Sequence, residues 1–398
     1  MDINDALNYF KENIDWIFNG IGAVALGWII KDKLKYKISN KLNDNATSIV
    51  VDGDYKNNND SHQSYIIHGN YTPGISIKEA REIALDVYKA NSYELSENAQ
   101  REAIRRAEEI AEDFFTDIYN NFPEKMQRLE EPSIQSSFFE AQKEYAKSGE
   151  ETLKNQLLQL LSDRINTEEY TLKQIVLDEA IKTISKLTKD QINCLSLIAS
   201  LIYLIHNITN LTALADLINN RILIFYSENM GVREFFSHMQ YSGSCIILPE
   251  GKTFISIEEI FLKRYTGLFS NGFTEEEFKK DIDQNIDYYR PLLMECLHNK
   301  QKLQINAMNI NVLENEMNKN GINKNTNKII ELFKRTTMNK DEVATVLIEI
   351  NSNMEKLIEF WKSKADLKVL KLTSVGLTIA TLNYNQRTKG SVQLDSYI

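Results

Sequence analysis

The stretch Trp16-Ile-Phe-Asn-Gly-Ile-Gly-Ala-Val-Ala-Leu-Gly-Trp-Ile-Ile30 contains no charged residue. It is shorter than the roughly 20 apolar residues that typically span a bilayer core, yet its flanks are those of a membrane anchor. Trp16 and Trp28 lie near its ends, where indole rings favour the membrane interface. A basic collar follows, formed by Lys31, Lys33, Lys35, Lys37 and Lys41. We therefore expect a single N-terminal transmembrane helix.

The position of the lysines predicts the orientation of this helix. Positive residues accumulate on the cytoplasmic side of a membrane helix, so we expect a single-pass protein of the bacterial inner membrane with its body in the cytoplasm. Gly20, Ala23 and Gly27 share one stripe, which predicts a face for close helix packing. A signal peptide and an interfacial helix are the alternatives. The first lacks a cleavage site, and the second would need a charged face.

Composition restricts the partners of the body that follows. The chain has 398 residues and a formal net charge of −10. Phosphate binding requires a basic surface, so we expect no nucleic-acid partner. Only the collar is locally basic, and anionic membrane lipid is the partner that it predicts.

The cysteines and histidines are too scattered to predict a metal site or a disulfide framework. Three cysteines are widely spaced, and no histidine stands at metal-ligand spacing from a cysteine or another histidine. We expect no metal and no cofactor. Cys245 follows His238 by seven residues, which allows a nucleophile hypothesis, although a buried and inert cysteine is the commoner case.

A short repeat follows the collar. Ser48-Ile-Val-Val-Asp-Gly-Asp-Tyr55 is echoed by Ser64-Tyr-Ile-Ile-His-Gly-Asn-Tyr71. Each copy is a β-prone run that ends in a turn signal, at Gly53-Asp54 and at Gly69-Asn70. Two short strands are marginal alone, so we predict an intersubunit β element and a homo-oligomer. A solvated linker is the alternative.

The rest of the chain is typical of a mainly α fold. Apolar residues recur at helical spacing from residue 77 onward, and prolines and glycines are few. The expected organisation is an anchor and collar (1–45), a short β-repeat segment (46–74), a main helical domain (75–320) and a C-terminal helical segment (321–398). The last boundary rests on the Asn-rich stretch 306–327.

Four regions allow sharper expectations. Residues 192–208 are the second most apolar stretch, for which a buried core helix is favoured over a second membrane span. The sequence around 241–254 predicts a small β-hairpin. A short heptad seam between Val343 and Trp361 fits a coiled coil, with packing inside the chain at least as well supported. Residues 367–384 predict a last hydrophobic helix.

Several phrases resemble a family of uncharacterised bacterial proteins. They span residues 79–91, 139–149, 174–180, 265–273 and 372–376, within a resemblance that covers most of residues 79–384. The resemblance implies a bacterial helical protein with an N-terminal anchor. It carries no established activity, so no residue inherits a catalytic role.

Taken together, these features predict a non-enzymatic, self-associating, membrane-anchored protein. An effector or sensor in bacterial stress or phage defence is the expected role. A membrane-tethered enzyme with a non-linear active site is one alternative, and a membrane scaffold that recruits a protein partner is another. The chain contains no Walker loop, no GxGxxG before a helix, no HExxH and no GxSxG, which disfavours the enzyme.

Overall fold

The computed structural model describes residues 97–231, 234–248, 255–364, 367, 369–390 and 392. It divides the chain into two compact units, Met1–Asn166 and Thr167–Ile398. The Asn-rich stretch 306–327, where a domain boundary was expected, lies inside the second unit.

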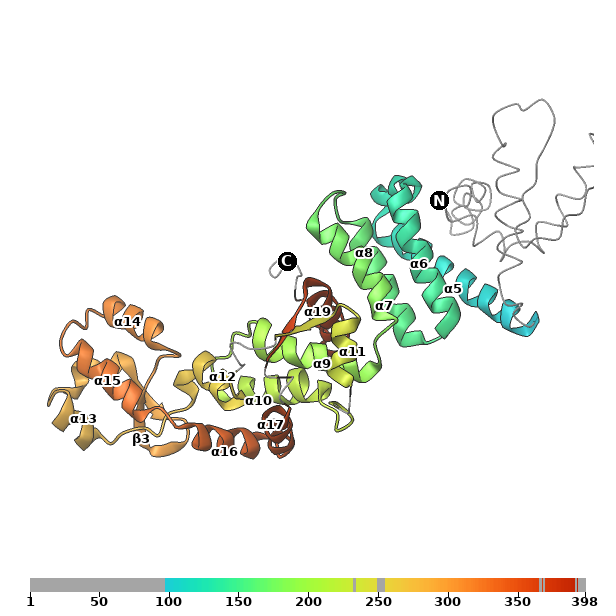
Figure 1. Cartoon of the computed structure of the whole chain (residues 1–398). Helices are drawn as coiled ribbons and strands as arrows, with labels where there is room; N and C mark the ends of the chain where they lie inside the picture. Colours follow the sequence, from blue (N-terminus) through green and yellow to red (C-terminus); the bar gives the residue numbers. More distant parts are fainter. Residues whose placement is uncertain are drawn as a thin grey trace, which may run out of the picture. The chain divides into compact units, whose positions relative to one another are not determined.

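The described part of the first unit is a set of antiparallel helices (Figure 1). Its elements are α5 (Glu97–Asn121), the 3₁₀-helix η1 (Pro123–Glu130), α6 (Pro132–Ser148) and α7 (Glu151–Ile165). The three α-helices contact one another in every pairing. The predicted apolar face of α5 lies in this core, with Ile110, Phe114 and Ile118 almost fully buried. Gly149 adopts a left-handed conformation and ends α6 as a glycine C-cap.

The second unit begins with a helical core. Its elements before the lobe described below are α8 (Leu172–Ile184), α9 (Lys189–Ile198), the π-helix η2 (Ala199–Tyr203), α10 (Leu211–Leu217), the π-helix η3 (Ile218–Ile222), η4 (Leu223–Phe225), α11 (Phe235–Tyr241), β1 (Cys245–Ile247), α12 (Ile257–Arg264) and η5 (Thr266–Leu268). After the lobe come α16 (Lys340–Ile350), α17 (Asn353–Ser363), β4 (Leu370–Leu372) and α19 (Ser374–Thr388). Helix α19 packs against both α8 and α9.

Between α12 and α16 the chain forms a lobe with a hydrophobic core of its own, visible in yellow and orange in Figure 1. Its elements are α13 (Glu275–Asp281), η6 (Ile286–Leu292), β2 (Leu293–Cys296), β3 (Asn299–Ile305), α14 (Ile310–Lys319) and α15 (Thr326–Thr336). Strands β2 and β3 form an antiparallel hairpin. Asn309 caps the N-terminus of α14, and Leu313 and Met317 of that helix enter the lobe core. The asparagines of this stretch therefore delimit helices within one folded lobe.

Capping residues explain where several helices begin. Thr188 and Gln191 form a capping box at α9, and Ser256 and Glu259 form one at α12. In each box the hydroxyl accepts a backbone N–H and the acidic or amide side chain accepts the N-cap N–H. These local signals fix helix starts without tertiary information.

The structure overturns the expected transmembrane helix. In the part of the chain that it describes, no helix is both long and apolar enough to cross a membrane. Helix α5 has 25 residues but carries charges throughout, whereas the apolar α9 has only 10 residues. Ten residues rise about 15 Å, half the thickness of a bilayer core. The same finding contradicts the single-pass inner-membrane location. Residues 16–30 themselves lie outside the described residues.

Four other expectations can be compared with the structure. The stretch 192–208 is the favoured buried core helix up to Ile198 and continues as a π-helix to Tyr203. Strand β1 does not form the expected local hairpin, because it pairs antiparallel with the distant β4.

The apolar residues of the seam 343–361 lie on α16 and α17 and are buried inside the chain, as one of the two expectations held. The last hydrophobic helix is confirmed from Ser374, and strand β4 stands before it where its first turn was expected.

Two glycines from the family-like phrases allow close backbone crossings. A Cβ on Gly267 would lie 1.9 Å from the Ala307 carbonyl oxygen, where the lobe joins the helical core. A Cβ on Gly376 would lie 1.8 Å from the Ser244 carbonyl oxygen, where α19 crosses the start of β1. No side chain fits at such distances, so these two residues have a structural role.

Candidate functional site

Most site residues predicted from the sequence lie outside the described residues. They are the packing stripe Gly20, Ala23 and Gly27, the interface residues Trp16, Trp28, Lys31, Lys33, Lys35 and Lys37, and the β-element residues Gly53, Asp54, Gly69 and Asn70. Their predicted roles stay predictions.

The Cys245 and His238 hypothesis can be examined directly. Cys245 is buried on β1, and burial raises the pKa of its thiol to about 12. The ring of His238 contacts the side-chain amide of Gln191. A thiol that stays protonated at neutral pH is a poor nucleophile. The geometry therefore favours the inert cysteine.

The polar stripe on α9 serves helix packing. Asn383 on α19 donates to the side chains of Asn193 (3.2 Å) and Ser196 (2.8 Å). Ser196 in turn donates to the Ala380 carbonyl at 3.0 Å. These hydrogen bonds satisfy polar groups inside an otherwise apolar contact and fix the register of α9 against α19.

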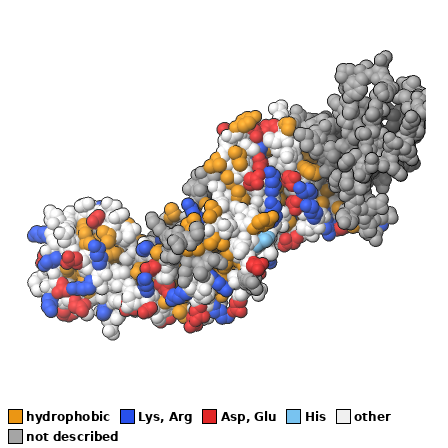
Figure 2. All heavy atoms as spheres, viewed as in Figure 1, with side chains coloured by type: hydrophobic (Ala, Val, Ile, Leu, Met, Phe, Trp, Pro, Cys, Tyr) orange, Lys and Arg blue, Asp and Glu red, His pale blue; other side chains and the backbone are white. Residues whose placement is uncertain are grey.

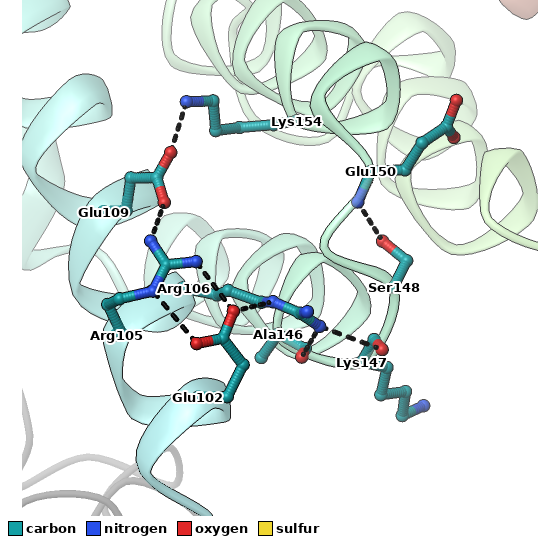
Figure 3. A network of polar contacts seen from close by, with 9 residues as sticks. All are labelled: Glu102, Arg105, Arg106, Glu109, Ala146, Lys147, Ser148, Glu150 and Lys154. Carbon is teal, nitrogen blue, oxygen red and sulfur yellow. Dashed lines mark hydrogen bonds and ion pairs between the residues drawn. The ribbon is translucent and has the colours of Figure 1, made fainter. Parts of the chain in front are cut away.

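A charged network ties the helices of the first unit together (Figure 3). Lys154 on α7 is nearly buried, and its Nζ lies 2.7 Å from Glu109, 3.1 Å from Asp113 and 2.9 Å from Glu151. These carboxylates raise the pKa of Lys154 against the opposing effect of burial. The lysine therefore remains charged and acts as a structural clasp between α5 and α7.

Arg106 completes the same network on the α6 side. Its guanidinium pairs with Glu102 and donates to the Ala146 and Lys147 carbonyls at the end of α6 (Figure 3). An arginine at a helix C-terminus satisfies carbonyls that have no partner within the helix. Each cation of this network meets carboxylates or helix-end carbonyls, and we assign the network to folding.

The best candidate for a functional site is a cavity of about 340 Å³ in the second unit. This volume lies at the lower end of the range typical of small-molecule sites. Three parts of the chain line the cavity. They are the loop 205–208, the α10–η3 helix with Ala213, Asp216 and Arg221, and the end of α19 with Tyr384, Gly390 and Val392.

Two π-helices border this cavity. One, η2, ends just before the loop 205–208, and the other, η3, carries Arg221. The Ser200 hydroxyl donates to the Arg221 carbonyl at 2.8 Å and joins the two segments. π-Helical turns are rare and occur frequently at functional sites, because they redirect side chains away from α-helical positions.

Hydrogen bonds from α12 hold the loop after η2 in place. Arg264 donates to the Leu204 carbonyl at 2.9 Å and to the Ile202 carbonyl at 2.5 Å. The Tyr265 hydroxyl donates to the His206 carbonyl at 3.2 Å. The loop backbone is therefore fixed, and His206 has a defined position at the cavity.

His206 is the unusual residue of the cavity. Its Nε2 is buried and has no hydrogen-bond partner within the described structure. The ring hydrogen-bonds the backbone of Ser200, and since Nε2 has no partner we assign the ring proton to Nδ1. Burial, with added repulsion from Arg221 and Arg264, lowers the pKa of His206 to about 4. At neutral pH the imidazole is uncharged.

Arg221 and Tyr384 provide the opposite hydrogen-bonding character. The Nε of Arg221 donates to Asp216 at 3.2 Å, and Arg221 also hydrogen-bonds the Tyr384 hydroxyl. Burial raises the pKa of Tyr384, so its hydroxyl stays protonated. The Tyr384 ring lies 6.0 Å from that of His206, between centroids, and stacks on Phe225 at 5.8 Å. Tyr384 is only 1% exposed, so it packs behind the cavity and helps to hold Arg221 in place.

The chain reverses after α19 and brings Gly390 next to Tyr384. Lys389 adopts a left-handed conformation, and the side-chain amide of Asn385 then pairs with both backbone groups of Val392, at 2.9 and 3.0 Å. Gly390 and Val392 thereby line the cavity. We call Lys389, Gly390 and Val392 the C-terminal strap.

This arrangement can bind a small molecule but is poorly suited to acid–base chemistry. A histidine with a pKa of about 4 is a weak base at neutral pH, and Asp216 is engaged by Arg221 and Asn220. Within the described ranges no three His, Cys, Asp or Glu side chains are grouped as metal ligands would be. Hydrogen bonding and shape are what the cavity offers.

Sequence reasoning missed this cavity. His206 lies in the stretch 192–208, which was expected only as a buried core helix, and no role was expected for Arg221 or Tyr384. A histidine and an asparagine at the end of the second most apolar run were the available signal. The three segments lie far apart in the sequence, so no spacing pattern could bring them together.

Comparison with known proteins identifies a family but no activity. No curated protein and no solved structure matches the chain. A protein-family model whose description names no function matches residues 74–398. This match covers well over half of the sequence and includes both close-crossing glycines. The chain therefore belongs to the family that this model describes.

Proposed function

We propose that this chain is a non-enzymatic, self-associating sensor or effector whose second unit binds a small polar molecule. The observation that carries the ligand is the cavity of about 340 Å³, which is lined by the polar residues His206, Asp216 and Arg221. A concave space with a few polar side chains is the usual form of a small-molecule site.

The non-enzymatic part of the proposal rests on the chemistry of the candidate groups. Cys245 has a raised pKa and no histidine contact that the structure describes, and His206 is uncharged with a lowered pKa. Neither group is prepared for nucleophilic or general acid–base work at neutral pH. An enzyme with a non-linear active site remains the alternative, and no cluster of described residues favours it.

The proposed partners follow from charge and from the repeat. On the face shown in Figure 2, acidic and basic side chains are interspersed, which is unlike the basic stripe of a nucleic-acid-binding surface. Self-association is proposed from the repeated β-prone segments at 48–55 and 64–71. A role in bacterial stress or phage defence is the context that we propose for such a sensor.

A cavity-filling variant tests the ligand-binding part. Ala213 lines the cavity from α10, whereas Ala215 on the same helix does not. The full chain and its Ala213→Phe and Ala215→Phe variants would be screened by thermal shift against nucleosides, amino acids, carboxamides and organic acids. A ligand at 100 times its Kd stabilises by about 2.7 kcal/mol, which gives a measurable rise in Tm.

We expect at least one class of compound to raise the Tm of the wild type and of Ala215→Phe but not of Ala213→Phe. The proposal fails if nothing shifts the wild type, or if every shift persists when Phe fills the cavity.

Self-association has its own test. Sedimentation velocity of the full chain should give a species larger than a monomer, and Gly53→Val combined with Gly69→Val should shift it toward the monomer, since valine resists positive φ. A monomeric wild type would contradict this part alone.

A further inference from the structure

We propose that the cavity binds a zwitterionic α-amino acid with an aliphatic side chain, whose ammonium group pairs with Asp216 and whose carboxylate pairs with Arg221. This inference rests on the proposed function and names the ligand class for that site. Both charged groups line the cavity and are open to a ligand, since each side chain is 47% exposed.

A π-helix places these two charges on the same face of the chain. Asp216 and Arg221 are five residues apart, and residues with that spacing lie about 140° apart around the axis of an α-helix. The π-helix η3 widens the turn between them, because its hydrogen bonds join residues that are five apart. The Nε of Arg221 therefore reaches the carboxylate of Asp216 at 3.2 Å.

Both members of this ion pair keep hydrogen-bonding capacity for a ligand. The two carboxylate oxygens of Asp216 accept from the side chains of Asn220 and Arg221, and a carboxylate offers further lone pairs to an ammonium group. Arg221 donates to Asp216 and also hydrogen-bonds the Tyr384 hydroxyl. A guanidinium has five N–H groups, so donors remain for the carboxylate of a ligand.

Opposite charges at one cavity favour a zwitterion over a simple anion or cation. An anion at Arg221 is repelled by Asp216, and a cation at Asp216 is repelled by Arg221. An α-amino acid carries both charges on neighbouring groups and is attracted at both positions. His206 is uncharged at neutral pH, so it leaves this balance unchanged.

The apolar part of the lining favours an aliphatic side chain on the ligand. Aliphatic residues from three segments line the cavity, namely Ile205, Ile208, Ala213 and Val392. Ile205 is 78% exposed, so a ligand that covers it removes apolar surface from water. The volume of about 340 Å³ lies at the lower end of the range for small-molecule sites and suits a single amino acid.

Leucine and its analogues separate the contributions of the two charges and of the side chain. Leucinamide keeps the ammonium group without the carboxylate, and 4-methylpentanoate keeps the carboxylate without the ammonium group. Alanine keeps both charges and has a shorter side chain. Binding of each compound, and of isoleucine and valine, to the full chain would be measured by titration calorimetry at neutral pH.

We expect leucine to bind the wild type more tightly than each of these three analogues, by about tenfold or more. Loss of one ligand charge leaves Asp216 or Arg221 without its ligand partner. Loss of aliphatic carbons leaves Ile205 uncovered.

Asp216→Asn tests the assigned ammonium partner. Leucine and leucinamide should each bind this variant about tenfold or more weakly, whereas 4-methylpentanoate, which has no ammonium group, should bind as well as before or better. The matched control is Asp287→Asn in the lobe, because Asp287 is also exposed and paired with an arginine but does not line the cavity. It should bind leucine as the wild type does.

Ile205→Asn tests the apolar contact. We expect leucine to bind this variant more weakly while alanine is unaffected. The matched control is Ile246→Asn on β1, where another exposed isoleucine lies outside the cavity lining. Because both isoleucines are exposed, neither substitution removes a core contact.

Three outcomes would overturn this inference while the binding site of the proposed function stands. If leucinamide or 4-methylpentanoate binds as tightly as leucine, the ligand is not recognised as a zwitterion. If Asp216→Asn weakens 4-methylpentanoate as much as leucine, Asp216 is not the ammonium partner. If leucine, isoleucine and valine all fail to bind although other compounds give Ala213-dependent thermal shifts, the ligand class is wrong.

Discussion

Two polar clusters in this protein, the charged network of the first unit and the cavity of the second, differ in how completely their groups are paired. Lys154 meets three carboxylates at 2.7 to 3.1 Å, and Arg106 meets a carboxylate and two helix-end carbonyls. At the cavity, the buried Nε2 of His206 has no partner in the described structure. A completed network stabilises a fold, whereas unused hydrogen-bonding capacity at a cavity indicates a place for a ligand.

The backbone around the clusters differs in the same sense. The charged network lies on regular α-helices, with side chains at ordinary helical spacing. The cavity lies beside two π-helices and a loop that arginine and tyrosine side chains from α12 hold in place. Irregular backbone that neighbouring residues maintain is common where binding takes priority over stability.

The largest effect is expected where α19, which carries Tyr384, crosses β1. Gly376→Ala would place a Cβ 1.8 Å from the Ser244 carbonyl oxygen, so the helix has to shift. Overpacking against backbone should lower the free energy of unfolding by about 3 kcal/mol or more. Urea denaturation measures it. At Gly243 a Cβ would meet nothing within 4 Å, and Gly243→Ala should cost only about 1 kcal/mol, for its positive φ. Equal losses of stability in the two variants would contradict the close backbone contact at Gly376.

The next effect separates the completed network from an ordinary surface pair. Lys154→Met leaves Glu109, Asp113 and Glu151 without their shared cation, and we expect a loss of about 2 kcal/mol, moderated because the carboxylates are partly exposed. Lys143→Met, on the exposed side of α6, should change stability by less than about 0.5 kcal/mol. Similar values from urea denaturation would show that the network adds nothing to the first unit.

A pH series tests His206, at the cavity of the second unit. The pKa of His206 is about 4 when folded, below the usual 6.5, so the unfolded chain binds more protons between these values. The stabilisation that uncharged His206 contributes to folding is therefore fully present above about pH 6.5, and it is lost as the pH falls toward 4. Arg221 and Arg264 disfavour its protonation, Asp216 favours it, and Tyr384 stays neutral in this range.

We expect wild type to lose about 1–2 kcal/mol more than His206→Asn between pH 7 and pH 4, after allowing for the partial exposure of the ring. Stability would be measured at both pH values in the same ionic strength. Parallel pH profiles for the two proteins would show that His206 is not held uncharged.

The smallest effect concerns the C-terminal strap. Asn385→Ala removes two hydrogen bonds to Val392, and we expect a loss of about 1 kcal/mol with faster dissociation of any cavity ligand. Asn320→Ala, at an exposed helix end in the lobe, is the control. An unchanged dissociation rate would mean that the strap does not close the cavity.

The parts of the fold that sequence could predict are those with local causes. The apolar face of α5, the capping boxes at Thr188 and Ser256 and the left-handed Gly149 each depend on neighbours in sequence, and the helical spacing of apolar residues is confirmed. The pairing of Cys245 with Leu372 could not be predicted, because nothing near either residue specifies its partner. The cavity shares that difficulty, since His206, Arg221 and Tyr384 meet only through tertiary packing.

The membrane prediction went wrong for a different reason. It was made from an apolar run and its flanks and then extended to the fold and location of the whole chain. The described helices are instead either charged, as α5 is, or short, as α9 is. Apolar helices of this length are buried against neighbouring helices, as α9 is against α19.

The central claim, that the His206 ring beside the cavity is held uncharged with an unpaired Nε2, is tested most directly by ¹⁵N NMR of the full chain labelled at histidine. His206→Phe identifies the signals of His206 among the five histidines. We predict a ring protonated only on Nδ1 that stays uncharged well below pH 6. A His206 ring that titrates near pH 6.5, or one protonated on Nε2, would contradict the account.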